Sequence, residues 1–125
     1  MKLLDTTVAI DHLRGVPAAT ALLRELVEQE EVIMASELVR FELLVGVRQR
    51  ELDALERFFS LVTWVPVDEA VARAAGLLAR QHRKAHSGID DVDFLIAASA
   101  LLFAAELLTT NVRHFPMLAN LTPAY

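Results

Sequence analysis

The chain contains no cysteine, and this absence excludes disulfide bonds, thiolate nucleophiles and zinc sites built on cysteine. It also lacks a long hydrophobic run: the longest, residues 94–105, is interrupted only by Ser99 and is too short to span a bilayer. No basic stretch followed by an apolar segment, the pattern of a secretion signal, opens the sequence. These absences lead us to expect a cytoplasmic protein that does not contact membranes.

Aromatic residues and breakers of secondary structure are also scarce. Trp64 and Tyr125 are the only residues of their types, and they form no evident platform for stacking nucleic-acid bases. Four glycines and four prolines are scattered, so no linker or low-complexity segment divides the chain. At 125 residues and 54% hydrophobic composition, we expect one domain covering residues 1–125. The net charge of −5 argues against a protein that coats nucleic acid, because such surfaces are usually basic.

Short apolar runs alternate with segments of helical periodicity along the whole chain. The expected strands are 3–4, 32–35, 61–67 and 107–110, with a short fifth strand at 121–122. The expected helices run from a cap at 5–7 to about 14, and over about 18–28, 36–46, 51–59, 68–84 and 90–102. This alternation is typical of a mostly parallel sheet that helices cover on both faces.

Four carboxylates lie where an apolar run ends or on the helical segments that follow: Asp5, Glu42, Asp90 and Asp93. In parallel sheets the ligand site lies beyond the carboxyl ends of the strands, and Asp5 and Asn111 follow two expected strands. Two like charges about 4 Å apart cost roughly 4 kcal/mol at an effective dielectric near 20. A divalent cation with a preference for oxygen ligands relieves such repulsion. The pattern therefore predicts a metal-dependent enzyme.

Each of these carboxylates also has an ordinary structural role open to it. Asp5 and Asp93 can cap the helices that follow them. Glu42 can lie on the wet face of an amphipathic helix. Asp90 and Asp93 are three residues apart and face the same side of a helical turn, whereas Asp91 points elsewhere. The spacing alone leaves both readings open.

Four short motifs occur in order: Asp-Thr-Thr at 5–7, Glu-Leu-Leu-Val-Gly at 42–46, Asp-Phe-Leu-Ile-Ala-Ala-Ser-Ala at 93–100 and Thr-Thr-Asn-Val-Arg-His-Phe at 109–115. In this order the motifs resemble the PIN-domain family and, within it, the VapC-type ribonuclease toxins of bacterial type II toxin–antitoxin systems. The resemblance covers essentially the whole chain. It implies a Rossmann-like three-layer α/β/α sandwich, with a sheet of four to five mostly parallel strands, and an acidic metal-binding pocket that cuts RNA.

Carried over by motif, Asp5, Glu42 and Asp93 match the family's core acidic positions and are expected to be catalytic residues and metal ligands. Asn111 matches a fourth position that is often aspartate, so the chain departs from the all-acidic pattern and a second metal is in doubt. We infer that Asp90 supplies the missing charge. The expected cofactor is Mg²⁺, with Mn²⁺ as a substitute. The expected reaction is hydrolysis of RNA by metal-activated water, which leaves a 5′-phosphate and a 3′-hydroxyl.

Candidate contacts for RNA phosphates are Thr6, Thr7, Arg80, Arg83 and Arg113. The arginines belong to two basic tracts, 80–86 and 113–114, although the dipole of a preceding helix also favours cations at its end. The resemblance further implies a cognate VapB-type antitoxin whose tail covers the acidic pocket, a homodimer and a toxin–antitoxin hetero-oligomer. Direct binding of DNA is not expected of this chain alone.

Other acidic-site families fit the sequence less well. A haloacid-dehalogenase-type phosphatase needs a second aspartate two residues after the first, where Thr7 stands. A receiver domain needs a lysine after a late strand, and neither Lys2 nor Lys84 fits that place. The alternative that remains is a catalytically weak or inactive PIN-like module that binds RNA or protein, and Asn111 keeps it open.

Overall fold

The computed structural model describes all 125 residues and contains one parallel sheet with the strand order β3–β2–β1–β4. The strands are β1 (Lys2–Leu4), β2 (Ile33–Ser36), β3 (Thr63–Val65) and β4 (Glu106–Leu108). In the central strand β1, Leu3 pairs with Met34 of β2 on one side and with Leu107 of β4 on the other. Leu3 is fully buried, as expected of a strand that is covered on both faces.

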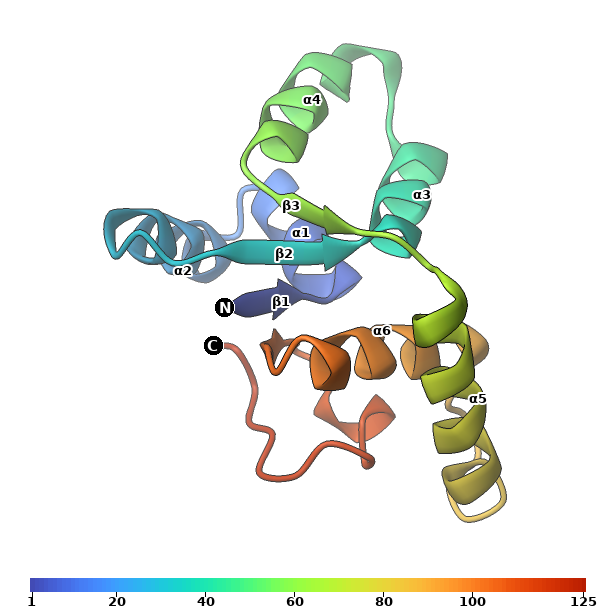
Figure 1. The fold of residues 1–125 in the computed structure, drawn as a ribbon. Helices are drawn as coiled ribbons and strands as arrows, with labels where there is room; N and C mark the ends of the chain where they lie inside the picture. The colour runs from blue at the N-terminus through green and yellow to red at the C-terminus, as the bar shows by residue number, and fades with distance from the viewer.

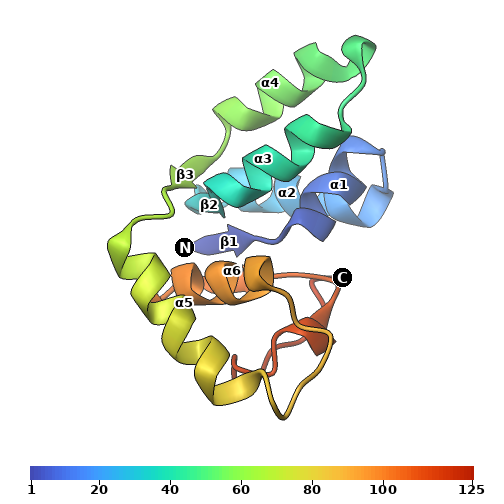
Figure 2. The same ribbon diagram turned by 90° about the vertical axis from the view of Figure 1, so that its right-hand side faces the viewer.

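Six α-helices and a short 3₁₀-helix connect the strands, and a second 3₁₀-helix follows β4 (Figure 1). They are α1 (Thr6–Leu13), α2 (Pro17–Glu28), α3 (Glu37–Gly46), η1 (Gln49–Glu51), α4 (Leu52–Ser60), α5 (Glu69–His82), α6 (Asp91–Leu102) and η2 (Val112–His114). Since parallel crossovers are right-handed, this strand order places α1–α4 on one face of the sheet and α5–α6 on the other. In Figure 2, α3 and α4 lie on the opposite side of β1 from α5 and α6. The three-layer α/β/α fold predicted from the sequence is confirmed.

Several helix starts follow directly from the sequence. The side chains of Asp5, Ser36, Asp68 and Asp90 accept hydrogen bonds from backbone N–H groups in the first turns of α1, α3, α5 and α6. The helix α2 instead begins with Pro17, whose fixed φ and missing N–H suit a first helical position. These caps place Asp5 and Asp90 at the N-termini of the helices that border the carboxyl ends of the strands.

Helix α6 is apolar nearly all round because the sheet covers one side of it and α5 the other. Ile96, Ala97 and Ala100 belong to the main core around the sheet. Phe94 and Ala98 belong to a smaller cluster with residues of α5. No helix of the structure has the length and the apolar composition needed to cross a membrane.

Three expected elements differ in extent. The strand predicted at 61–67 is limited to Thr63–Val65, since Pro66 cannot continue the hydrogen-bond ladder. The helix predicted to reach 84 ends at His82, with turns following up to Gly88. The fifth strand predicted at 121–122 does not form.

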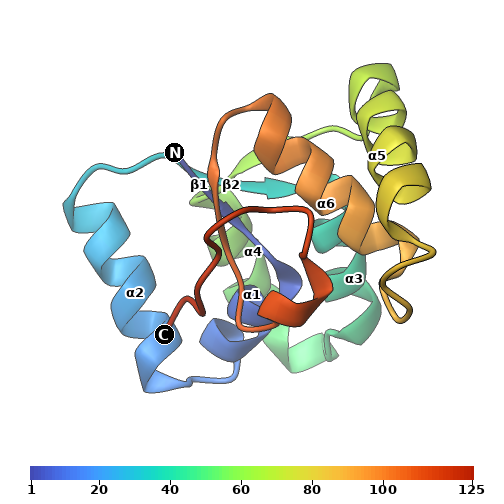
Figure 3. The same ribbon diagram turned by 90° about the horizontal axis from the view of Figure 1, so that it is seen from below.

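The C-terminal tail takes the place of that fifth strand and returns toward α1 (Figure 3). Its backbone makes one hydrogen bond to the end of β4, from Ala124 N–H to the Thr109 carbonyl at 2.9 Å. The preceding Pro123 has no N–H to donate, so a ladder cannot extend through it. The hydroxyl of Tyr125 donates to Asp11 Oδ2 at 2.6 Å and fixes the tail against α1.

Candidate active site

Asp5 lies directly after β1, and its buried carboxylate receives three hydrogen bonds from neutral donors. Its Oδ1 accepts from the Thr6 backbone N–H at 2.8 Å, which caps α1. Its Oδ2 accepts from the hydroxyl of Thr109 at 2.7 Å and from that of Thr7 at 3.3 Å. The capping role and the site role that the sequence left open are therefore compatible, since each oxygen of Asp5 serves one of them.

The residues after β4 connect its end to the end of β1. Thr109 is fully buried, donates its hydroxyl hydrogen to Asp5 and accepts a hydrogen bond from Asn111 N–H at 2.9 Å. Thr110 N–H donates to the hydroxyl of Thr7 at 3.3 Å. The chain leaves β1 and enters β4 on opposite faces of the sheet, so this junction is the switch point where parallel sheets bind ligands.

Asp93 approaches the same junction from the first turn of α6. It shares a reciprocal capping box with Asp90: Asp93 N–H donates to Asp90 Oδ1 at 3.1 Å, and Asp90 N–H donates to Asp93 Oδ2 at 3.3 Å. The Nδ1 atom of His114, in η2, lies 3.1 Å from the same Oδ2. Asp93 is 9% exposed, whereas Asp90 is exposed to solvent.

The electrostatics of Asp93 reflect this surrounding. Burial raises the pKa of the Asp93 carboxyl from its usual 3.8 to about 6. The hydrogen bond from the Asp90 backbone and the imidazole of His114 lower this pKa, while the negative charges of Asp90 and Asp5 raise it. The effect of Asp5 means that carboxylates separated by 88 residues lie within electrostatic reach of each other.

Glu42 joins the site through a single hydrogen bond. It lies on α3, is exposed, and accepts from the hydroxyl of Thr6 at 2.9 Å. This bond links Glu42 to Thr6, the residue that follows Asp5 in the chain. Glu42 thus lies on the solvent-exposed face of α3 and is also hydrogen-bonded to Thr6.

The arrangement suits a hard divalent cation in one particular way. The side-chain positions form no group of three or more histidine or acidic residues close enough to hold a metal ion. Mg²⁺, however, is commonly bound by one or two carboxylates, with water and substrate phosphate as its other ligands. Asp5 and Asp93 provide such a pair of buried oxygen donors, and burial raises the pKa of Asp93, which an opposite charge would counteract. The donor chemistry therefore fits the expected ion.

The candidate RNA contacts fall into three places. Thr6 and Thr7 belong to the hydrogen-bond network around Asp5. Arg83 forms an ion pair with Asp91 in the first turn of α6, and Arg80 lies on the last turn of α5. Arg113 is exposed on η2, two residues after Asn111, and has no ion-pair partner. Of these side chains, only those of Thr6 and Thr7 hydrogen-bond to acidic residues of the site.

Two site residues were not singled out from the sequence. Thr109 falls within the strand expected at 107–110, and His114 within the basic tract 113–114. Thr109 follows two buried leucines of β4, and a polar residue there is the one sequence signal that could have indicated it. The contact of His114 with Asp93 depends on the turn of η2 and has no comparable signal.

Comparisons with known proteins identify the family of the chain. The family model described as "PIN domain" matches residues 2–120. Ribonuclease VapC19 of Mycobacterium tuberculosis is 64% identical over 125 residues, the full length of both chains. Ribonuclease VapC10 of the same organism is 37% identical over 100% of this chain and 93% of its own length.

Solved structures agree in fold. A toxin–antitoxin complex from Klebsiella pneumoniae matches with a TM-score of 0.82 at 20% identity, covering 100% of this chain and 98% of the other. VapBC2 from Rickettsia felis, bound to a DNA fragment from its promoter, matches with a TM-score of 0.83 at 22% identity, covering 98% and 96%. Since the motif resemblance, the family match over residues 2–120 and the full-length identity to two VapC proteins agree, the chain belongs to the PIN-domain family and, within it, to the VapC group.

Proposed function

We propose that this protein is a metal-dependent endoribonuclease and the toxin of a toxin–antitoxin pair. The ribonuclease class predicted from the sequence is confirmed by two full-length relatives that are named ribonucleases. The metal dependence rests on one observation: Asp5 and Asp93 are buried, lie at the switch point of a parallel sheet, and repel each other electrostatically. A cation is the simplest group that stabilises both carboxylates in their charged form.

We assign each residue of the site a role according to its position. Asp5 and Asp93 would hold Mg²⁺ or Mn²⁺, with Asp90 adding negative charge from the same turn as Asp93. When bound, the ion supplies Lewis-acid stabilisation of the phosphate and acidifies the attacking water. Glu42 is exposed and held 2.9 Å from Thr6, so we assign it the role of orienting that water and accepting its proton. Thr6, Thr7 and Asn111 lie at the rim, where a substrate phosphate would pass.

The test is cleavage of a labelled RNA by the purified protein with Mg²⁺ and with EDTA. We expect cleavage that requires Mg²⁺ and is lost in Asp5→Asn, which keeps the shape of the side chain. Asp53→Asn, an exposed carboxylate of α4, is the matched control and should cleave normally. Ends carrying 2′,3′-cyclic phosphate would contradict hydrolysis by water.

A groove beside the site is the place we propose for the antitoxin. It has a volume of about 390 Å³ and lies between α1 and the segment formed by α3, η1 and α4. Its apolar wall consists of Ile10, Leu13, Leu43, Val47, Ala54 and Leu55. Glu42 lines the groove and also contacts Thr6. A peptide seated in the groove would therefore reach the acidic site, which accounts for inhibition by contact.

The antitoxin site can be tested without disturbing catalysis. Ala54 is exposed in the groove, and Ala54→Trp fills it with a large side chain. We expect inhibition by the cognate VapB-type antitoxin to weaken by about tenfold or more, because a peptide cannot occupy a filled groove and a loss of about 1.4 kcal/mol already weakens binding tenfold. Cleavage in the absence of antitoxin should persist. Ala21→Trp, at an exposed position on α2, should be inhibited like the wild type.

We also propose a homodimer. Helix α3 exposes three large apolar side chains at helical spacing: Phe41 (64% exposed), Leu44 (43%) and Val45 (71%). Covering them would remove apolar surface from water. Val45→Glu should then convert a dimer to a monomer in light-scattering measurements, and a wild-type protein that is monomeric at high concentration would contradict the proposal.

The inactive PIN-like module remains the second candidate. Asn111 lacks a charge, and no three acidic or histidine side chains are grouped closely enough to hold a metal by themselves. The cleavage assay separates the two functions. RNA binding without Mg²⁺-dependent cleavage would favour the module, whereas cleavage lost in Asp5→Asn would reject it.

A further inference from the structure

Helix α5 distributes its charges unevenly along its length. Near its start, Glu69 and Arg73 form an ion pair across one turn, with Oε1 and Nη2 3.3 Å apart. Arg80 lies in its last turn, and Arg83 and Lys84 follow in the turn after His82, where the helix ends. Together with Ala79 they line a single shallow hollow of about 390 Å³. We call these three cations the α5 basic patch.

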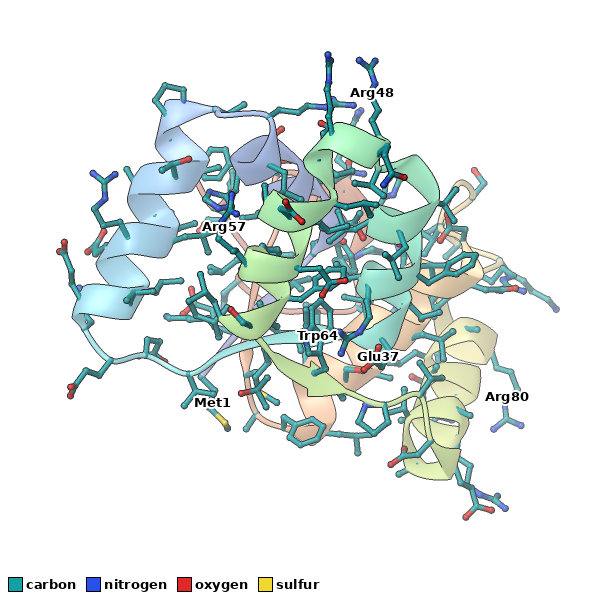
Figure 4. The ribbon with its side chains drawn as sticks, turned by 90° about the horizontal axis from the view of Figure 1, so that it is seen from above. Met1, Glu37, Arg48, Arg57, Trp64 and Arg80 are labelled. Atoms are coloured by element: carbon teal, nitrogen blue, oxygen red, sulfur yellow. The ribbon has the colours of Figure 1, made fainter.

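The α5 basic patch carries more positive charge than helix stability explains. The helix dipole favours cations in the last turn, by about 0.3–1 kcal/mol each. The three like charges line one hollow, however, and repel one another. Arg80 and Lys84 are exposed and have no ion-pair partner to reduce that repulsion. In Figure 4, Arg80 projects from α5 away from the body of the protein. The patch is thus positioned to bind an external anion.

Arg83 fixes the patch to the helix that carries the acidic site. Its guanidinium forms an ion pair with Asp91 and lies 5.3 Å from the centre of the buried Phe94 ring. Asp91 adjoins Asp90, and Phe94 adjoins Asp93. Arg83 therefore places the patch at the N-terminal end of α6, the end that also carries Asp90 and Asp93. An anion bound to the patch would lie at the same end of α6 as the proposed reaction centre.

We infer that the α5 basic patch binds backbone phosphates of the RNA strand beside the bond that is cleaved. This inference rests on the proposed ribonuclease function and names how the substrate is held. The chain has a net charge of −5, so its average field repels RNA, and a local group of cations is needed to hold the strand. Arg80 and Lys84 contact the phosphates. Arg83, which is paired with Asp91, mainly holds these two cations in place. Contacts of this kind carry no base specificity.

The experiment measures RNA binding in a protein that cannot cleave. A fluorescent single-stranded RNA is titrated with Asp5→Asn in Mg²⁺ at several KCl concentrations, with and without Arg80→Gln and Lys84→Gln together. Each lost phosphate contact should reduce the slope of log K against log salt by about 0.7, hence by about 1.4 for the pair. If the two proteins bind equally at 1 M salt, the Kd at 0.1 M salt should be about 25-fold higher in the patch variant.

Arg24→Gln with Arg57→Gln is the matched control, since both arginines are exposed on helices of the opposite layer and their loss changes the net charge equally. The control should leave the slope and the Kd close to those of the parent. In the enzyme with Asp5 intact, the patch variant should raise KM and change kcat little, as expected for uniform substrate binding.

The outcomes separate this inference from the proposed function. If the wild type neither binds nor cleaves RNA, the proposed function fails and this inference fails with it. If RNA is cleaved but the patch variant matches the Arg24 and Arg57 control, only this inference is overturned. If the patch variant binds RNA normally but loses affinity for an acidic antitoxin segment, the patch is a protein-binding surface and the inference is overturned as well.

Discussion

The two sides of the acidic site hold their carboxylates in different ways. On the strand side, Asp5 receives hydrogen bonds from one backbone N–H and from the hydroxyls of Thr7 and Thr109. On the helix side, Asp93 has a backbone N–H at 3.3 Å and the imidazole of His114 at 3.1 Å, and burial raises its pKa to about 6. The comparison teaches that several neutral donors hold Asp5, whereas Asp93 has fewer hydrogen bonds and burial disfavours its charged form.

Removing the negative charge from either side should have the largest effect. We expect Asp5→Asn and Asp93→Asn each to reduce RNA cleavage by roughly 10³-fold, because several kcal/mol of transition-state stabilisation depends on the ion. If the two carboxylates act as a unit, the double variant should be no slower than either single variant. Single-turnover cleavage rates measure this, and additive losses would show that the two sides act independently.

Removing a neutral hydrogen-bond donor to Asp5 should cause the next largest loss of cleavage activity. Thr109→Val removes the buried hydroxyl that donates to Asp5 but keeps the shape of the side chain. Groups that orient metal ligands typically contribute 10–100-fold to metal affinity or activity, and we expect a loss in this range. The Mg²⁺ dependence of cleavage measures it. Thr110→Val, at an exposed neighbouring position, should behave as the wild type.

Ionisation of Asp93 should make the stability of the folded protein depend on pH. An unfolded chain carries Asp93 with a pKa near 3.8, whereas the pKa in the folded protein is about 6. Between these values the folded state binds more protons, so the contribution of Asp93 to stability falls as pH rises from about 4 to 6. In EDTA, the unfolding midpoint of the wild type should therefore fall over this window relative to that of Asp93→Asn.

Mg²⁺ sharpens the same test. At pH 7.5, where Asp93 is ionised, the ion should raise the unfolding midpoint of the wild type and should raise that of Asp93→Asn much less. Thermal unfolding followed by circular dichroism measures both effects. If the wild type and Asp93→Asn respond equally to pH and to Mg²⁺, the charge of Asp93 does not affect stability or ion binding.

The smallest effect is expected at Asp90, which caps α6 and also repels Asp93. Asp90→Ala removes the cap and should lower the free energy of unfolding by about 1 kcal/mol. Asp90→Asn keeps a capping side chain and removes the charge, so its stability should be close to that of the wild type. Urea unfolding of the two variants separates the cap from the charge, and equal losses would show that the charge itself stabilises the helix.

Much of the fold could be predicted because local rules and tertiary packing agree along this chain. Buried apolar runs formed β1, β2 and β4 close to the expected residues, and capping side chains began α3 and α6 where they were expected. The failure at 121–122 has a local cause, since Pro123 interrupts any ladder there.

The site was predictable where its position follows from chain direction. Asp5 comes at the end of a parallel strand and Asp93 begins a helix that returns to the sheet, so topology brings them to one rim. The contact of His114 could not be foreseen, and Thr109 had only the weak signal of a polar residue after two buried leucines. Their contacts depend on side-chain orientations that sequence spacing does not determine.

The hydrogen bond of the C-terminal tail gives the site a remote reporter. The Ala124 amide donates to the carbonyl of Thr109, whose hydroxyl holds Asp5. Binding that reduces the motion of Asp5 also restrains Thr109. The hydrogen exchange of the Ala124 amide should then slow as binding increases. A spectroscopist could therefore follow ion or RNA binding from an amide that takes no part in the chemistry, in the wild-type protein and without a label near the acidic residues.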